Sequence, residues 1–264
     1  MLPIPDFLRT AMSPEHWPVF VLITARIGGL MLTAPMWSAP MFPRQVRAAL
    51  TVVLAALLLP SAPIVNMPEQ VIQLPLPVAS EMAIGIVIGL AASVLVTAVG
   101  LAGEVLSMQM GLSVAASFSP VPELQVPGIA PLSGVLAMLV YLTMGGHLML
   151  LKGLAASLKV LPPGQGFDFA GGASAVTSLS GQLFACAVSA AAPVMVALLL
   201  TNIALAILSK AVPQLNAMMV SFPITVGIGL LMFAASLPIV AGTFSGWMNG
   251  LPNGIDHMLL HLQP

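Results

Sequence analysis

Apolar segments long enough to cross a lipid bilayer follow one another along most of this chain, and they constrain its fold more than any other feature. The hydrocarbon core of a bilayer is about 30 Å thick and needs about 20 apolar residues in helical conformation. Six such segments are bounded by proline, glycine or charged residues, and they cover residues 17–34, 46–65, 78–111, 129–161, 181–208 and 217–240. The sequence therefore predicts an all-α, membrane-associated protein with about six long apolar helices arranged as helical hairpins.

The scarcity of charge excludes several classes of function. Charged side chains make up 6% of the chain, against about 25% in an ordinary soluble domain. The formal net charge is −1 and the sequence has no basic cluster, so we expect membrane lipid and not nucleic acid as a partner. The lone Cys186 lies in an apolar run and indicates no redox compartment. Asp6, Arg9 and Glu15 occupy the N-terminal region in place of a basic stretch, so no cleaved signal peptide is expected.

Some stretches depart from this regular pattern. Residues 78–111 would form a helix of about 50 Å, longer than a bilayer is thick, so it either kinks at Gly100 and Gly103 or continues outside the lipid. Residues 112–131 are rich in serine, alanine and proline and predict a long, functional loop. Residues 165–180 are interpreted as a polar, glycine-bearing connector. Residues 209–216 are interpreted as the polar tip of a hairpin, with Lys210 in the last helical turn.

One cation lies where a charge is expensive. Arg26 interrupts the first apolar segment, and an arginine at the centre of a membrane span costs about 2.5 to 3.5 kcal/mol on insertion scales. Glu81 and Glu104 are the acids available to it. We favour a buried structural pair within a helix bundle. The alternative is an ion or proton relay in a six-helix secondary transporter, which would be expected to show an internal repeat that is not evident here.

The sequence offers no recognisable catalytic, cofactor-binding or metal site. His147 has no second ligand at i+3 or i+4, and His257 and His261 lack a third ligand nearby. No G-x-S-x-G, Walker loop or G-x-G-x-x-G motif occurs in the sequence. The pairs Gly85-x-x-x-Gly89, Gly100-x-x-Gly103 and Gly227-x-Gly229 instead indicate close helix packing, within the chain or between subunits. A non-enzymatic scaffold or insertase-like membrane protein without a pore is a third possibility.

Several strings, in order along nearly the whole chain, resemble the FliR family of flagellar type III export gates and its injectisome, SctT-type, counterparts. No single string is diagnostic, but the ordered set is specific. The matching strings are 25–27 with 33–35 (ARI, TAP), 43–47 (PRQVR), 81–85 (EMAIG), 102–104 through 109–113 (AGE, QMGLS), 146–148 (GHL), 161–164 (LPPG), and 211–216 with 221–223 (AVPQLN, SFP).

The resemblance implies an organisation and a set of partners. Residues 191–223 also resemble the hairpin of a FliQ-type subunit, which suggests a FliP-like part at 1–170 and a FliQ-like hairpin with a tail at 171–264. The family's pattern implies one copy of this chain in a helical, cone-shaped assembly with FliP-type and FliQ-type subunits. An FlhB-type subunit would lie at its entrance. The site would be the bacterial inner membrane at the flagellar basal body, and unfolded flagellar proteins would pass through the channel.

The resemblance also assigns roles to two segments. The loop at about 111–122 corresponds to the family's pore plug, which closes the channel at rest; the residues concerned here are Met110, Gly111, Leu112, Ser113 and Phe118. The hairpin tip corresponds to the part that faces the cytoplasmic entrance and the FlhB-type partner; its residues are Lys210, Pro213, Gln214, Leu215 and Asn216.

Overall fold

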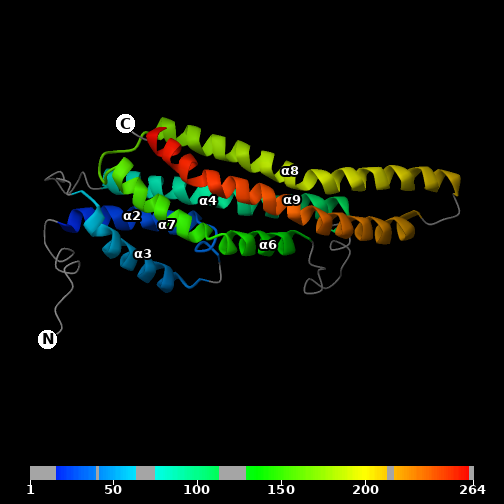
Figure 1. Ribbon diagram of the computed structural model, residues 1–264, viewed down its shortest axis with the longest axis horizontal. Helices are drawn as coiled ribbons and strands as arrows, with labels where there is room; N and C mark the ends of the chain where they lie inside the picture. Colours follow the sequence, from blue (N-terminus) through cyan, green and yellow to red (C-terminus); the bar gives the residue numbers. More distant parts are fainter. Residues whose placement is uncertain (1–15, 40–41, 64–74, 113–128, 213–216, 262–264) are drawn as a thin grey trace. The chain divides into compact units, whose positions relative to one another are not determined.

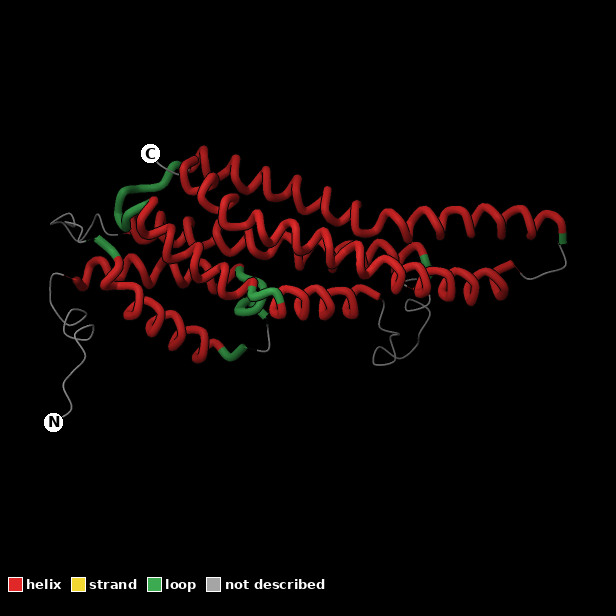
Figure 2. Tube along the Cα trace, in the orientation of Figure 1, coloured by secondary structure: helices red, strands yellow, loops and turns green. Residues whose placement is uncertain are grey.

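The computed structural model describes residues 16–39, 42–63, 75–112, 129–212 and 217–261, and every regular element in these ranges is helical (Figures 1 and 2). The all-α prediction is therefore confirmed. The elements are α2 (Trp17–Thr33), α3 (Arg44–Leu58), the short 3-10 helix η2 (Leu59–Ser61), α4 (Pro75–Gln109), α6 (Ile129–Thr143), α7 (Gly146–Val160), α8 (Phe169–Ala211) and α9 (Ala217–His261).

Four helical stretches in the described ranges are long and apolar enough to cross a membrane: Arg44–Ser61, Pro75–Gln109, Phe169–Ala211 and Met219–Trp247. A fifth span results if α6 and α7 are counted together, and α2 is a shorter apolar helix. The six apolar segments of the sequence thus correspond to helices, while fewer than six meet the length and composition expected of a complete span.

The chain divides into two compact units that interleave along the sequence. Unit 1 contains residues 1–94, 144–180 and 248–264, and unit 2 contains residues 95–143 and 181–247. Within unit 1, α2 packs against α3, and the buried side chains of α2 include Leu22, Ile23, Ile27 and Leu30. Within unit 2, the core joins apolar residues of α4, α6 and α8; it contains Ala102, Leu106, Met110, Ile129, Ala191, Val194 and Leu198. The expected division into parts 1–170 and 171–264 is a statement about sequence likeness. The two compact units do not test it, so it stays a prediction.

The connector expected at residues 165–180 is wrong from residue 169 onward, because α8 already begins at Phe169. The carboxylate of Asp168 accepts the backbone N–H groups of Ala170 at 3.0 Å and Gly171 at 2.9 Å, which is the bonding of a helix N-cap. The polar residues that follow donate their hydroxyl protons to carbonyls three or four residues earlier; they are Ser174, Thr177, Ser178 and Ser180. Capping and this local bonding let a polar stretch join the helix.

Three other boundaries also differ from or refine the expectation. α4 is one helix of 35 residues that includes Gly100 and Gly103, and its continuation outside the lipid stays a prediction. The apolar segment at 129–161 forms two helices, because Gly145, with φ of +72°, separates α6 from α7. α9 continues to His261, well beyond the expected end at residue 240.

Candidate functional site

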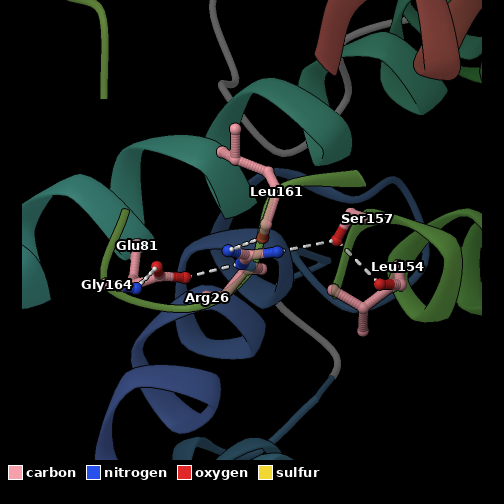
Figure 3. A network of polar contacts seen from close by, with 6 residues as sticks. All are labelled: Arg26, Glu81, Leu154, Ser157, Leu161 and Gly164. Atoms are coloured by element: carbon pink, nitrogen blue, oxygen red, sulfur yellow. Dashed lines mark hydrogen bonds and ion pairs between the residues drawn. The ribbon is translucent and has the colours of Figure 1, made fainter. Parts of the chain in front are cut away.

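The buried guanidinium of Arg26 is the centre of a polar network in unit 1 (Figure 3). Its Nε donates to Oε2 of Glu81 at 2.6 Å, its Nη1 donates to Oγ of Ser157 at 3.1 Å, and its Nη2 donates to the backbone carbonyl of Leu161 at 2.8 Å. The Arg26 and Glu81 side chains have exposed fractions of 0% and 2%. Because all three guanidinium nitrogens have an acceptor and a carboxylate balances the charge, the cation is accommodated away from solvent.

Glu81 extends the network to the turn after α7. Its second carboxylate oxygen, Oε1, accepts the backbone N–H of Gly164 at 2.9 Å. Gly164 has φ of +85°, a left-handed conformation that a residue with a β-carbon rarely adopts, so this turn favours glycine at 164. Both carboxylate oxygens of Glu81 therefore accept a hydrogen bond, one from the Arg26 side chain of α2 and one from the backbone of the turn after α7.

Ser157 completes the network from α7. Its Oγ donates to the carbonyl of Leu154 at 2.7 Å while it accepts from Arg26. The hydroxyl proton is thus used within α7, and only a lone pair faces the guanidinium. Arg26 consequently connects α2 to α4 through Glu81, and to α7 and its following turn through Ser157 and Leu161.

Glycines on both helices bring α2 and the first part of α4 into backbone contact. A β-carbon at Gly85 would collide with the carbonyl oxygen of Arg26, and a β-carbon at Gly29 would collide with the carbonyl oxygen of Met82. At Gly89 it would collide with the Thr33 hydroxyl, which bonds the Ile86 carbonyl at 3.1 Å. The predicted packing role of Gly85-x-x-x-Gly89 is confirmed, and it operates within the chain.

Glu104, the other acid proposed for Arg26, has a different environment. It is exposed on the part of α4 that belongs to unit 2, and the Arg26 network does not include it. The network is also closed: each nitrogen of Arg26 and each oxygen of Glu81 already has a partner. This arrangement is suited to holding helices together and offers no free group to pass a proton onward.

The residues assigned to the start of the plug lie at the end of α4. Met110 is 1% exposed in the unit 2 core, and its side chain fills the place that a β-carbon at Gly229 of α9 would need. Gly111 follows with φ of +77°, and Leu112 packs against the same core. Ser113 and Phe118 lie outside the described residues. The chain thus leaves α4 from an anchored point.

At the other predicted site, the hairpin tip, only Lys210 falls within the described residues. It is exposed in the last turn of α8, where a cation complements the partial negative charge of the helix end. Pro213, Gln214, Leu215 and Asn216 lie outside the described residues. No group of three or more His, Cys, Asp or Glu side chains able to hold a metal occurs in the part of the chain that the structure describes.

Sequence reasoning did not identify Ser157, the Leu161 carbonyl or the Gly164 N–H as partners of the Arg26–Glu81 pair. No local pattern distinguishes Ser157 from the other serines of the chain. The string at 161–164 contained a signal, since two prolines before a glycine predict a tight turn, but a turn does not reveal which side chain it will bond.

Comparison with known proteins identifies sequences that are similar to this chain. Residues 17–251 match the family described as "Bacterial export proteins, family 1". The flagellar biosynthetic protein FliR of Escherichia coli K12 is 31% identical over 225 residues, covering 85% of this chain and 84% of that protein. FliR of Pectobacterium carotovorum is 31% identical, covering 87% and 86%, and FliR of Bacillus subtilis 168 is 27% identical, covering 86% and 88%.

Proposed function

Because this chain belongs to the FliR family of bacterial export proteins, we propose that it is the single-copy core subunit of the flagellar type III protein export gate. It is a membrane protein of the flagellar export apparatus, and in the proposal it forms and plugs the channel through which unfolded flagellar proteins leave the cell. The observation that carries the proposal is the match to FliR proteins over 85% of this chain, in a chain built from apolar helices.

The plug assignment is supported by the end of α4. A segment that closes a channel needs a fixed base, so that its tip returns to the same place after each passage. Met110 supplies such a base, because it is buried against Gly229 and lies among Leu106, Val194 and Leu198. Gly111, with its positive φ, redirects the chain immediately afterwards. In the proposal Leu112, Ser113 and Phe118 continue from this base into the channel.

The surface of the second half of the chain supports an assembly with other subunits. Large apolar side chains that are at least half exposed follow one another along α8; they are Phe184, Val188, Val196, Leu199, Leu200, Ile203 and Ile207. Contiguous exposed apolar surface of this kind is typical of a protein or lipid interface. We propose FliP-type and FliQ-type gate subunits as its neighbours, and an FlhB-type subunit at the hairpin tip around Lys210, with the whole at the basal body in the bacterial inner membrane.

The proposed role is that of a passive conduit, with energy supplied by other components. The Arg26 network fits this role as a structural clamp within unit 1, because each guanidinium nitrogen and each oxygen of Glu81 bonds another group of the unit. The transporter alternative instead requires Arg26, Glu81 and Glu104 to take part in ion movement. Glu104→Gln separates the two: motility is expected to be unchanged for a gate subunit, whereas loss of motility with normal protein levels would favour a relay.

The central experiment is purification of the affinity-tagged full chain from bacterial membranes, followed by mass measurement of the intact complex. We expect one copy of this chain together with several copies of two smaller helical membrane proteins. In parallel, a strain with residues 113–122 deleted is expected to leak ions or secrete abnormally, while a strain with a deletion in the tail at 262–264 is not. Purification of the chain as an active monomer would exclude the proposed function.

A further inference from the structure

An apolar cavity of about 190 Å³ lies within unit 2. Its walls come from α4, α6 and α9, with Ala190 of α8 at one side. The floor is fully packed, since Leu106, Ala137 and Phe244 are 1%, 3% and 1% exposed. Leu237 and Ala241, one turn apart on α9, are exposed and form part of its rim. The cavity therefore has a buried floor and an apolar opening along α9.

The wall of this cavity presents mainly carbon, and it has no free hydrogen-bond donor. Its two hydroxyls have no proton left to donate, because Ser133 donates to the carbonyl of Ala130 and Ser236 to the carbonyl of Phe233, both at 2.8 Å. None of the lining residues is charged. A polar ligand would find no hydrogen-bond donor here and at most the lone pairs of two serines. An extended peptide segment would have to bury backbone N–H and C=O groups unpaired, which is costly.

The size of the cavity favours a flexible hydrocarbon chain. An apolar cavity of about 150 Å³ stays free of water and binds a molecule as large as benzene, and this one is larger. A single aliphatic side chain from a neighbouring subunit would leave part of it empty, and unfilled space forfeits dispersion contacts. An acyl chain adapts its length and shape to the space. Two of the walls, α4 and α9, contain stretches apolar enough to cross a membrane, so a lipid chain matches the chemistry of the helices around the opening.

We propose that this cavity binds one acyl chain of a membrane phospholipid, which enters past Leu237 and Ala241. Because the lining has no charged group and no free hydrogen-bond donor, we expect binding that does not depend on the headgroup. The inference rests on the cavity and on the apolar spans, and it does not require the plug or the gate function.

The probe is a phospholipid with a photoreactive diazirine in its acyl chain, supplied in phosphatidylethanolamine and phosphatidylglycerol forms. The tagged protein, in the complex as isolated from membranes, is irradiated, washed with detergent to remove loosely held lipid, and digested. We expect labelled peptides from residues 129–143 and 217–247, with yields from the two headgroups that agree within about twofold. Ala137→Leu, which fills the cavity from its floor, is expected to reduce the labelling at least about fivefold.

Ala185→Leu is the matched control, because it is the same exchange at an exposed position of α8 that does not line the cavity. It is expected to leave the labelling unchanged. If Ala137→Leu prevents accumulation of the protein, Ala241→Leu at the rim replaces it. Three outcomes overturn the proposal: no label in these peptides, label that survives cavity filling, or cross-links from a photoreactive residue at position 241 to a neighbouring protein subunit in place of lipid.

Discussion

The backbone carbonyl of Arg26 lies against Gly85 so closely that a β-carbon at position 85 would overlap it. This contact determines which acid the arginine meets. Glu81 lies four residues before Gly85, and residues spaced four apart share one face of a helix. Once the two backbones touch at Gly85, the Glu81 carboxylate lies beside the guanidinium and bonds it at 2.6 Å.

Gly85→Ala is expected to destabilise the protein by about 1 to 3 kcal/mol or more, because the collision is with backbone and cannot be relieved by a rotamer change. Gly100→Ala is the matched control on the same helix, since no atom lies within 4 Å of a β-carbon there; it is expected to be neutral or to stabilise by up to about 1 kcal/mol. The measurement is the thermal midpoint of the purified complex together with the amount of protein in membranes. Equal effects of the two exchanges would contradict the close contact.

Removal of either partner of the buried ion pair is expected to be severe. Arg26→Met or Glu81→Met leaves an uncompensated buried charge and should cost about 3 to 5 kcal/mol. The double variant leaves no charge and should cost less than the sum of the two single variants, by at least about 1 kcal/mol. Recovery is expected to be partial, because the Leu161 carbonyl and the Gly164 N–H lose their partners. Thermal denaturation of the four proteins completes the cycle, and strict additivity would show that the pair is not coupled.

The contact between Met110 and Gly229 allows a test of the proposed plug by a substitution on α9, outside the plug itself. Gly229→Ala introduces a β-carbon where the Met110 side chain lies, whereas Gly227→Ala adds one where no atom lies within 4 Å. On the proposed function, Gly229→Ala displaces the base of the plug and raises ion leak, and Gly227→Ala does not.

The Gly229→Ala/Met110→Ala double variant should recover part of the closure, since the smaller side chain leaves room for the new β-carbon. Conductance of the purified complex in planar bilayers and thermal stability are measured side by side. If Gly229→Ala lowers stability but does not change the leak, the packing contact is supported and the anchored plug is contradicted.

Asp168 is expected to determine where α8 begins. Asp168→Ala removes the acceptor of the Ala170 and Gly171 N–H groups and should cost about 0.5 to 2 kcal/mol. Asp168→Asn keeps a side-chain oxygen at the cap and is expected to retain most of the stability. Hydrogen exchange of residues 169–180 is the direct measurement: protection should fall in the alanine variant only. Unchanged protection in that variant would mean that packing, and not the cap, holds the first turns of α8.

Much of the helical pattern could be predicted from the sequence, for a local reason. In an apolar environment each backbone N–H and C=O group must bond within its own segment, so long apolar runs between prolines and glycines become helices. This predicted α2 and the helical conformation of the segment at 129–161. It did not predict the start of α8, because residues 169–180 look like a connector until the Asp168 cap and the hydroxyl-to-carbonyl bonds are known.

The sequence by itself determined that this chain is an apolar, all-helical membrane protein with a buried cation in need of an acid, because composition and hydrophobic length are properties of the chain alone. It left Glu81 and Glu104 equivalent as partners for Arg26. Only the tertiary structure decided between them, since the choice depends on which face of α4 contacts α2. That contact occurs at Gly85, where the absence of a side chain lets the two backbones meet. The cavity in unit 2 likewise exists only when α4, α6 and α9 pack together, because no local pattern records the volume that three helices leave between them.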